Sequence, residues 1–127
     1  MVTQGQTFRL SNSQINNHLH IILSDPKLNP EKIVTVNFTS RRPDKDQSCL
    51  VEVGEHPFLT KPSCINYDNR LITEEQWKQC LTACSLILNE PLSPSLLKRI
   101  LQGAAISPYL PLGNHQILVE QGLIDGD

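Results

Sequence analysis

Five short runs of strand-forming residues follow one another in the first half of this chain, separated by turns rich in Pro, Asn, Asp and Gly. Strands that run parallel need crossover connections of about a dozen residues or more, and the connections here are shorter. The spacing therefore predicts an antiparallel sheet, and closure into a small barrel would remove its edge strands. The runs cover residues 5–10, 18–24, 33–40, 48–53 and 63–68.

Two of these runs alternate between apolar and polar residues, which assigns the two faces of the sheet. Successive side chains of a strand point to opposite faces, so residues two apart share a face. We expect a core face formed by Leu19, Ile21, Leu23, Val34, Val36 and Phe38. The other face then carries His18, His20, Ile22, Thr35, Asn37 and Thr39.

Helix-forming residues and helix start signals begin near residue 72. Thr73 is followed three residues later by Gln76, which is the spacing of a capping box. We expect a helix over 74–89. Its core stripe would be Trp77, Leu81, Cys84 and Leu88.

A second helix start lies at Ser93 and Pro94, with serine as the N-cap and proline at the first helical position. This helix is expected to run toward Gly103, and a third short helix is expected over 113–124. The fold class is thus mainly β within α+β, as one domain over 1–127. The barrel covers about 5–72 and the helical part about 73–127.

The composition sets limits on the class of protein. The chain has 127 residues, 39% of them apolar, and a formal net charge of −2, which fits one globular domain without a broad basic surface. No apolar run is long enough to span a membrane, and the N-terminus lacks the pattern of a signal peptide, so we expect a cytoplasmic protein. The four cysteines, Cys49, Cys64, Cys80 and Cys84, are expected to be reduced.

Histidines are the first candidates for chemistry, because imidazole can give or take a proton near neutral pH. His18 and His20 share the polar face with threonines. The alternative is that both histidines are half-exposed strand residues on the solvated face, without a role in chemistry. His56 follows Gly54 and precedes Pro57, so it lies on a stiffened loop. The alternative is a structural loop, in which Phe58 plugs the barrel end and His56 caps the turn.

Charged residues supply further candidates. Arg41 and Arg42 leave the strand that ends at Thr39 and Ser40, and an arginine fork there could hold a phosphate. A solvated charged loop is the competing interpretation. Asp68 could act as a base if it shares the cleft.

The sequence carries none of the common cofactor or metal motifs. His and Cys residues are present, but none are spaced as the close pairs of structural zinc sites. The glycine-rich turns of nucleotide-binding proteins and the nucleophile turn of α/β-hydrolases are missing as well. We therefore expect no metal and no cofactor.

Four segments together resemble the PemK/MazF-like toxins of type II toxin–antitoxin systems, and most closely a branch with a G-[DE]-H-P-F motif. The resemblance implies an SH3-like barrel with C-terminal helices and a homodimer that cleaves single-stranded RNA without metal. It also implies inhibition by a cognate antitoxin protein. The segments are HLHIILSDP (18–26), IVTVNFTS (33–40), SCLVEVGEHPF (48–58) and SCINYDN (63–69).

The resemblance carries over to few positions. Thr39 and Ser40 match the Thr-Ser that ends the corresponding strand, and Asp68 matches an acidic position of some members. Two arginines of typical members are replaced, one near His18 and one by Asn66.

Other residues must then supply the missing acid, base and charge. We expect the catalytic residues His18, Thr39, His56 and Asp68, with substrate bound by His20, Ser40, Arg41, Arg42 and Tyr67. The alternative is a catalytically silent barrel that binds a protein, peptide or nucleic acid through the same cleft.

Overall fold

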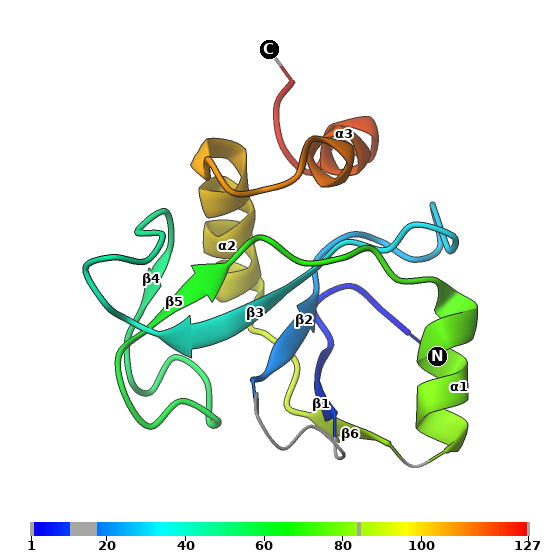
Figure 1. Cartoon of the computed structure of the whole chain (residues 1–127), viewed down its shortest axis with the longest axis horizontal. Helices are drawn as coiled ribbons and strands as arrows, with labels where there is room; N and C mark the ends of the chain where they lie inside the picture. Colours follow the sequence, from blue (N-terminus) through cyan, green and yellow to red (C-terminus); the bar gives the residue numbers. More distant parts are fainter. Residues whose placement is uncertain (1, 11–17, 84, 127) are drawn as a thin grey trace.

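A single six-stranded sheet with helices against both faces makes up the structure (Figure 1). It is a computed structural model, which describes residues 2–10, 18–83 and 85–126. The strands are β1 (Thr7–Leu10), β2 (His20–Ile22), β3 (Thr35–Ser40), β4 (Leu50–Val51), β5 (Ser63–Asn66) and β6 (Leu86–Asn89). The helices are α1 (Glu74–Thr82), α2 (Pro94–Ile106) and α3 (Leu112–Glu120).

All neighbouring strands of the sheet are antiparallel, in the order β4-β5-β3-β2-β1-β6. This confirms the antiparallel sheet that the short connections predict. The order ends at β4 on one side and at β6 on the other, and no pairing joins these two edges in the described part of the chain. The sheet is therefore open, and the expected barrel is not confirmed.

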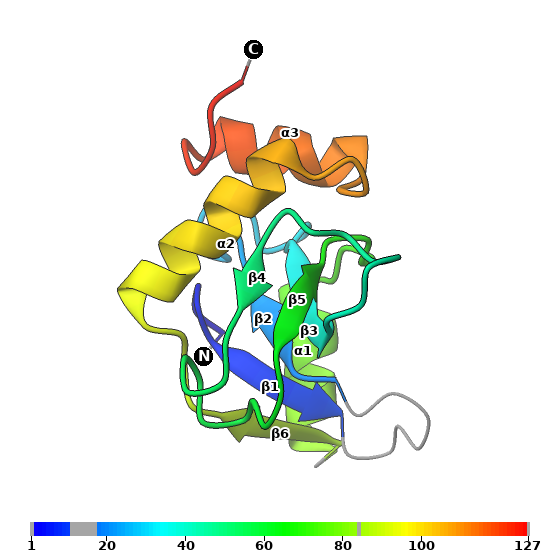
Figure 2. The same cartoon turned by 90° about the vertical axis from the view of Figure 1, so that its left-hand side faces the viewer.

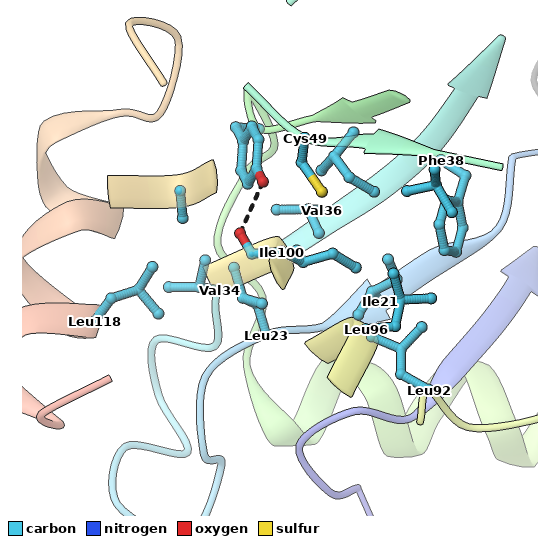
Figure 3. Close-up of a cluster of buried hydrophobic side chains, with 14 of the residues drawn as sticks. Ile21, Leu23, Val34, Val36, Phe38, Cys49, Leu92, Leu96, Ile100 and Leu118 are labelled. Atoms are coloured by element: carbon cyan, nitrogen blue, oxygen red, sulfur yellow. Dashed lines mark hydrogen bonds between the residues drawn. The ribbon is translucent and has the colours of Figure 1, made fainter. Parts of the chain in front are cut away.

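The main core lies between one face of the sheet and the helices α2 and α3 (Figures 1 and 2). The six apolar residues that alternation assigns to this face are all buried there, which confirms the assignment. Figure 3 shows how Ile21 and Val36 of the sheet meet Leu96 and Ile100 of α2. The Tyr67 hydroxyl donates a hydrogen bond of 2.7 Å to the carbonyl of Ile100, the dashed line in Figure 3.

The helix α1 covers part of the opposite face, where Trp77 packs with Phe8 and Ile22. Its capping box forms as predicted: the Thr73 hydroxyl accepts from the Gln76 backbone, and the Gln76 side chain accepts from the Thr73 backbone.

The predicted end of this helix is wrong, because the chain leaves it at Thr82 and forms β6 over Leu86–Asn89. Four residues of β6 pair with β1, and that backbone pairing replaces the last two helical turns. Leu81 and Leu88 are 37% and 47% exposed, so of the predicted stripe only Trp77 is a core residue; Cys84 lies outside the described residues.

The two later helices follow their sequence signals. Ser93 caps α2, and its hydroxyl accepts from the backbone N–H of Leu96 at 3.2 Å. The helix ends at Ile106, before Pro108, and α3 covers most of the predicted 113–124. Among the described residues, no helix has the length and apolar character that crossing a bilayer demands.

Candidate functional site

A polar cavity of about 350 Å³ opens on the sheet face opposite the main core. Three of the four predicted catalytic residues, His18, Thr39 and Asp68, line it. Side chains two residues apart on a strand share a face, and His18 and Thr39 lie on the polar face that this alternation predicts. The other lining residues are Asn37, Asp44, Lys45, Asp46, Cys64, Ile65, Asn66 and Tyr109.

Asparagine side chains stabilise one wall of the polar cavity. The Asn37 side-chain oxygen accepts from Asn66 Nδ2 at 3.2 Å and from Asn69 Nδ2 at 2.9 Å. Asn114 of α3 in turn donates to the Asn69 carbonyl at 3.0 Å. Asn37 and Asn114 are both buried, so these bonds satisfy amides that would otherwise be costly to bury. The network fixes β3 against β5 beside the cavity.

His18 is held in one tautomer by the backbone. Its Nδ1 lies 3.1 Å from the Phe38 carbonyl oxygen, which can only accept, so Nδ1 carries the hydrogen. In the neutral ring Nε2 then keeps its lone pair, and the described part of the chain gives Nε2 no hydrogen-bond partner. A histidine oriented in this way can take a proton from a bound group.

Lys45 brings a cation to the polar cavity that was not among the predicted site residues. Its ammonium donates to Thr39 Oγ1 at 2.7 Å and to the Ser40 carbonyl at 2.9 Å. An ammonium has three hydrogens, so one remains for a ligand. The backbone N–H of Lys45 bonds to the Arg42 carbonyl at 3.1 Å, a turn that folds the loop back over the strand end. In the sequence, the turn-forming residues Pro43 and Asp44 indicate this turn.

Three carboxylates line the polar cavity together with this ammonium. The Asp46 carboxylate accepts from the backbone and hydroxyl of Ser48 and from the Ser107 hydroxyl, so it anchors the loop to the end of α2. Asp44 lies 3.7 Å from Arg42 on the surface. Asp68 is exposed at the mouth of the cavity.

His56 lies away from the polar cavity and is buried with 3% exposure. Its Nδ1 accepts from the backbone N–H of Phe58 at 3.1 Å, and its Nε2 is 2.6 Å from the Glu90 carbonyl oxygen. These two bonds fit a neutral ring with the hydrogen on Nε2. The structure therefore does not bring His56 together with His18. Gly54 has φ of +96°, in keeping with the tight path expected before His56.

His56→Leu is expected to lower the free energy of unfolding by about 1–3 kcal/mol, because it leaves the Phe58 N–H without its partner and removes one of the two hydrogen bonds that the Glu90 carbonyl accepts, the other coming from Thr7 Oγ1. Urea denaturation measures this. Lys61→Ala, an exposed change on the next turn, is the control and should leave stability unchanged. An unchanged urea midpoint for His56→Leu would contradict the structural role.

The two predicted arginines do not line the polar cavity. Arg41 donates to Glu52 at 2.5 Å and to the Val51 carbonyl at 3.2 Å, so it ties β3 to β4. Arg42 is exposed beside Asp44. The competing interpretation, a solvated charged loop, describes Arg42, whereas Arg41 forms a partly buried structural ion pair. Ser40 contributes only its carbonyl, through Lys45.

Tyr67 is fully buried on the core face, so its ring cannot make the predicted contact with substrate in the polar cavity. It lies two residues after Ile65 and shares that residue's face, whereas Asn66 and Asp68 face the polar cavity. Burial raises the pKa of the Tyr67 hydroxyl far above its usual range.

His20 also lies on the polar side of the sheet, outside the polar cavity. Its ring stacks on Phe8, with centroids 5.3 Å apart. Burial, and secondarily the nearby His18, lowers the pKa of His20 below its usual value. Its ring is therefore neutral at neutral pH.

The chain matches no protein-family model, no curated protein and no solved structure. The resemblance to PemK/MazF-like toxins thus stays a prediction. Across residues 2–10, 18–83 and 85–126, no three His, Cys, Asp or Glu side chains are grouped so that they could hold a metal ion.

Proposed function

We propose that this chain is a PemK/MazF-like toxin that cleaves single-stranded RNA in the polar cavity, without a metal ion. The observation that carries the proposal is that His18, Thr39 and Asp68 line one cavity, to which Lys45 adds a cation. As a toxin of this kind the protein would act in the cytoplasm as a homodimer, and a cognate antitoxin would block it.

The chemistry needs a base, a cation for the phosphate and a group that positions it. His18 Nε2 takes the proton of the ribose 2′-hydroxyl, whose oxygen bonds to the adjacent phosphorus. The bond from phosphorus to the 5′-oxygen breaks, that oxygen takes a proton from water, and the hydroxide left behind takes the proton from His18. The products are a 2′,3′-cyclic phosphate and a 5′-hydroxyl.

Lys45 and Thr39 stabilise the charge on the phosphorus oxygens in this scheme. The ammonium has one hydrogen left after its bonds to Thr39 and Ser40. The Thr39 hydroxyl, which accepts from Lys45, is free to donate its own hydrogen to a phosphate oxygen. Asp68 at the mouth can accept a hydrogen bond from the ribose.

Tyr109 supports a single-stranded substrate. It lines the polar cavity and is 57% exposed, so its ring is open to a ligand. Unpaired bases stack on exposed aromatic rings with little regard to sequence. A base beside the cleaved phosphate could rest on this ring.

Lys45→Ala is expected to slow cleavage of a single-stranded RNA by about 10²-fold, because it removes the charge that stabilises the developing phosphorane. Lys45→Arg should keep part of the activity. Lys61→Ala, an exposed lysine outside the cavity, is the control and should cut at the wild-type rate. Cleavage rates measured in EDTA test this, and an unchanged rate for Lys45→Ala would overturn the role of the cation.

One observation favours a second candidate, the catalytically silent binding module. Three carboxylates, those of Asp44, Asp46 and Asp68, line the polar cavity beside one ammonium, and the second histidine lies elsewhere. The three carboxylates would be complementary to a basic protein segment. If the folded protein binds a basic peptide and leaves RNA intact, this candidate replaces the first.

A further inference from the structure

A second, mostly apolar cavity of about 330 Å³ adjoins the polar cavity on the same side of the sheet. Its lining includes Phe8, His20 and Trp77, together with the polar residues Asn69, Arg70 and Gln76. We call it the apolar cavity. Its size lies in the range of small-ligand pockets, which combine apolar walls with a few polar groups.

The two cavities lie next to each other along β2 and β3. His18 lines the polar cavity and His20 the apolar one, while on the next strand Asn37 and Thr35 do the same. Same-face neighbours on a strand are about 7 Å apart. The bond of 2.9 Å from Asn69 Nδ2 to Asn37 Oδ1 links the walls of both cavities. A ligand in one therefore lies next to a ligand in the other.

The walls of the apolar cavity are aromatic and flat. The Phe8 and His20 rings are stacked with an interplanar angle of 22°, and Trp77 packs in the same cluster as Phe8. The low pKa of His20, caused mainly by burial, keeps its ring uncharged. Uncharged flat walls favour a planar ring over a phosphate or a sugar.

The polar groups of the lining suit the edge of a heterocycle. Both hydrogens of the Asn69 amide are used, by Asn37 and by the Asn66 carbonyl, so its oxygen remains as an acceptor. The Gln76 oxygen accepts from Thr73, so its NH₂ remains as a donor. The exposed guanidinium of Arg70 adds a cation and further donors.

We infer that the apolar cavity takes one base of a single-stranded RNA whose adjacent phosphate lies in the polar cavity. The inference rests on the proposed function, since it needs RNA as the ligand. It adds a recognition site that cleavage chemistry alone does not need.

The test uses Trp77, the one tryptophan of the chain, as a built-in reporter on the wall of the apolar cavity. The probe is a labelled hexaribonucleotide pool of mixed sequence with 2′-O-methyl groups, which block attack by the 2′-oxygen. Anisotropy of the label measures binding, and Trp77 fluorescence measures occupancy of the cavity. We expect both signals to change at the same probe concentrations.

Two variants and a control sharpen this experiment. His20→Leu keeps the bulk but loses the heteroaromatic ring, and about tenfold weaker binding is expected. Arg70→Ala, an exposed change that spares the fold, should weaken binding severalfold. Lys98→Ala removes one charge from α2, outside both cavities, and should bind as the wild type does.

The outcomes separate this inference from the proposed function. Binding without a Trp77 signal, and with equal affinity for all variants, overturns the inference and leaves RNA cleavage open. Cavity occupancy in a protein that does not cut unmodified RNA supports the inference and overturns cleavage. No binding of the pool overturns the inference, while cleavage is decided separately on unmodified RNA. Tight binding of a free nucleoside monophosphate, with none of the pool, would show a small-molecule site and overturn the inference.

Discussion

Gly103→Ala should lower the free energy of unfolding by about 1–3 kcal/mol, although alanine is the better helix former. A β-carbon at position 103 of α2 would overlap the Tyr67 hydroxyl and would lie 2.8 Å from Cys49 Cβ. The hydroxyl cannot withdraw without losing its 2.7 Å bond to Ile100. The helix cannot withdraw either, because Ile100 is packed in the main core.

Urea or guanidinium denaturation measures this effect, and the chain supplies a matched control. Gly113 lies in α3 with nothing within 4 Å of the place that an added β-carbon would occupy, so Gly113→Ala should be neutral or slightly stabilising. Tyr67→Phe combined with Gly103→Ala should be less destabilising than the sum of the single changes, since the overlap with the hydroxyl is gone and only the close approach to Cys49 remains. A Gly103→Ala protein as stable as the wild type would contradict this packing.

His18→Ala should reduce the rate of RNA cleavage by about 10²–10⁴-fold while the fold persists, because general-base catalysis contributes that much. The Phe38 carbonyl holds His18 in the tautomer whose Nε2 can accept a proton. Alanine leaves no group that can do this at the same position. Initial rates on a long single-stranded RNA, with circular dichroism to check folding, measure the effect.

His115→Ala is the matched control, because it removes a histidine of α3 that lines neither cavity. It should cut as the wild type does. Equal rates for His18→Ala and the wild type would rule out His18 as the base and would leave Asp68 as the remaining candidate in the polar cavity.

The two faces of the sheet could be predicted because the alternation of side chains along a strand depends only on the local sequence. Val36 and Phe38 are buried on one face, and Asn37 and Thr39 line the polar cavity on the other. The same rule places Tyr67 on the core side, between Asn66 and Asp68, and so predicts its burial.

The end of α1 was not predictable from local signals. Leu88 fits the predicted helical stripe as well as a strand, and the decision depends on its pairing with Phe8, far away in the sequence. Closure of the sheet is likewise a long-range property, and the sheet remains open.

The polar cavity could be predicted only in part. Parity brings His18 and Thr39 together, but Lys45 reaches Thr39 through the shape of a loop that the sequence signals only weakly. His56 is buried by a contact with the Glu90 carbonyl, 34 residues further along. Contacts of this kind depend on the finished fold.

The most direct test of the proposed cleavage is the chemistry of the RNA ends that the wild-type protein leaves. The purified protein is incubated with a long single-stranded RNA in EDTA, and the termini of the fragments are determined. We expect fragments that carry 2′,3′-cyclic phosphates and 5′-hydroxyls. Intact RNA beside a folded protein, or fragments with 5′-phosphates, would contradict the proposed cleavage.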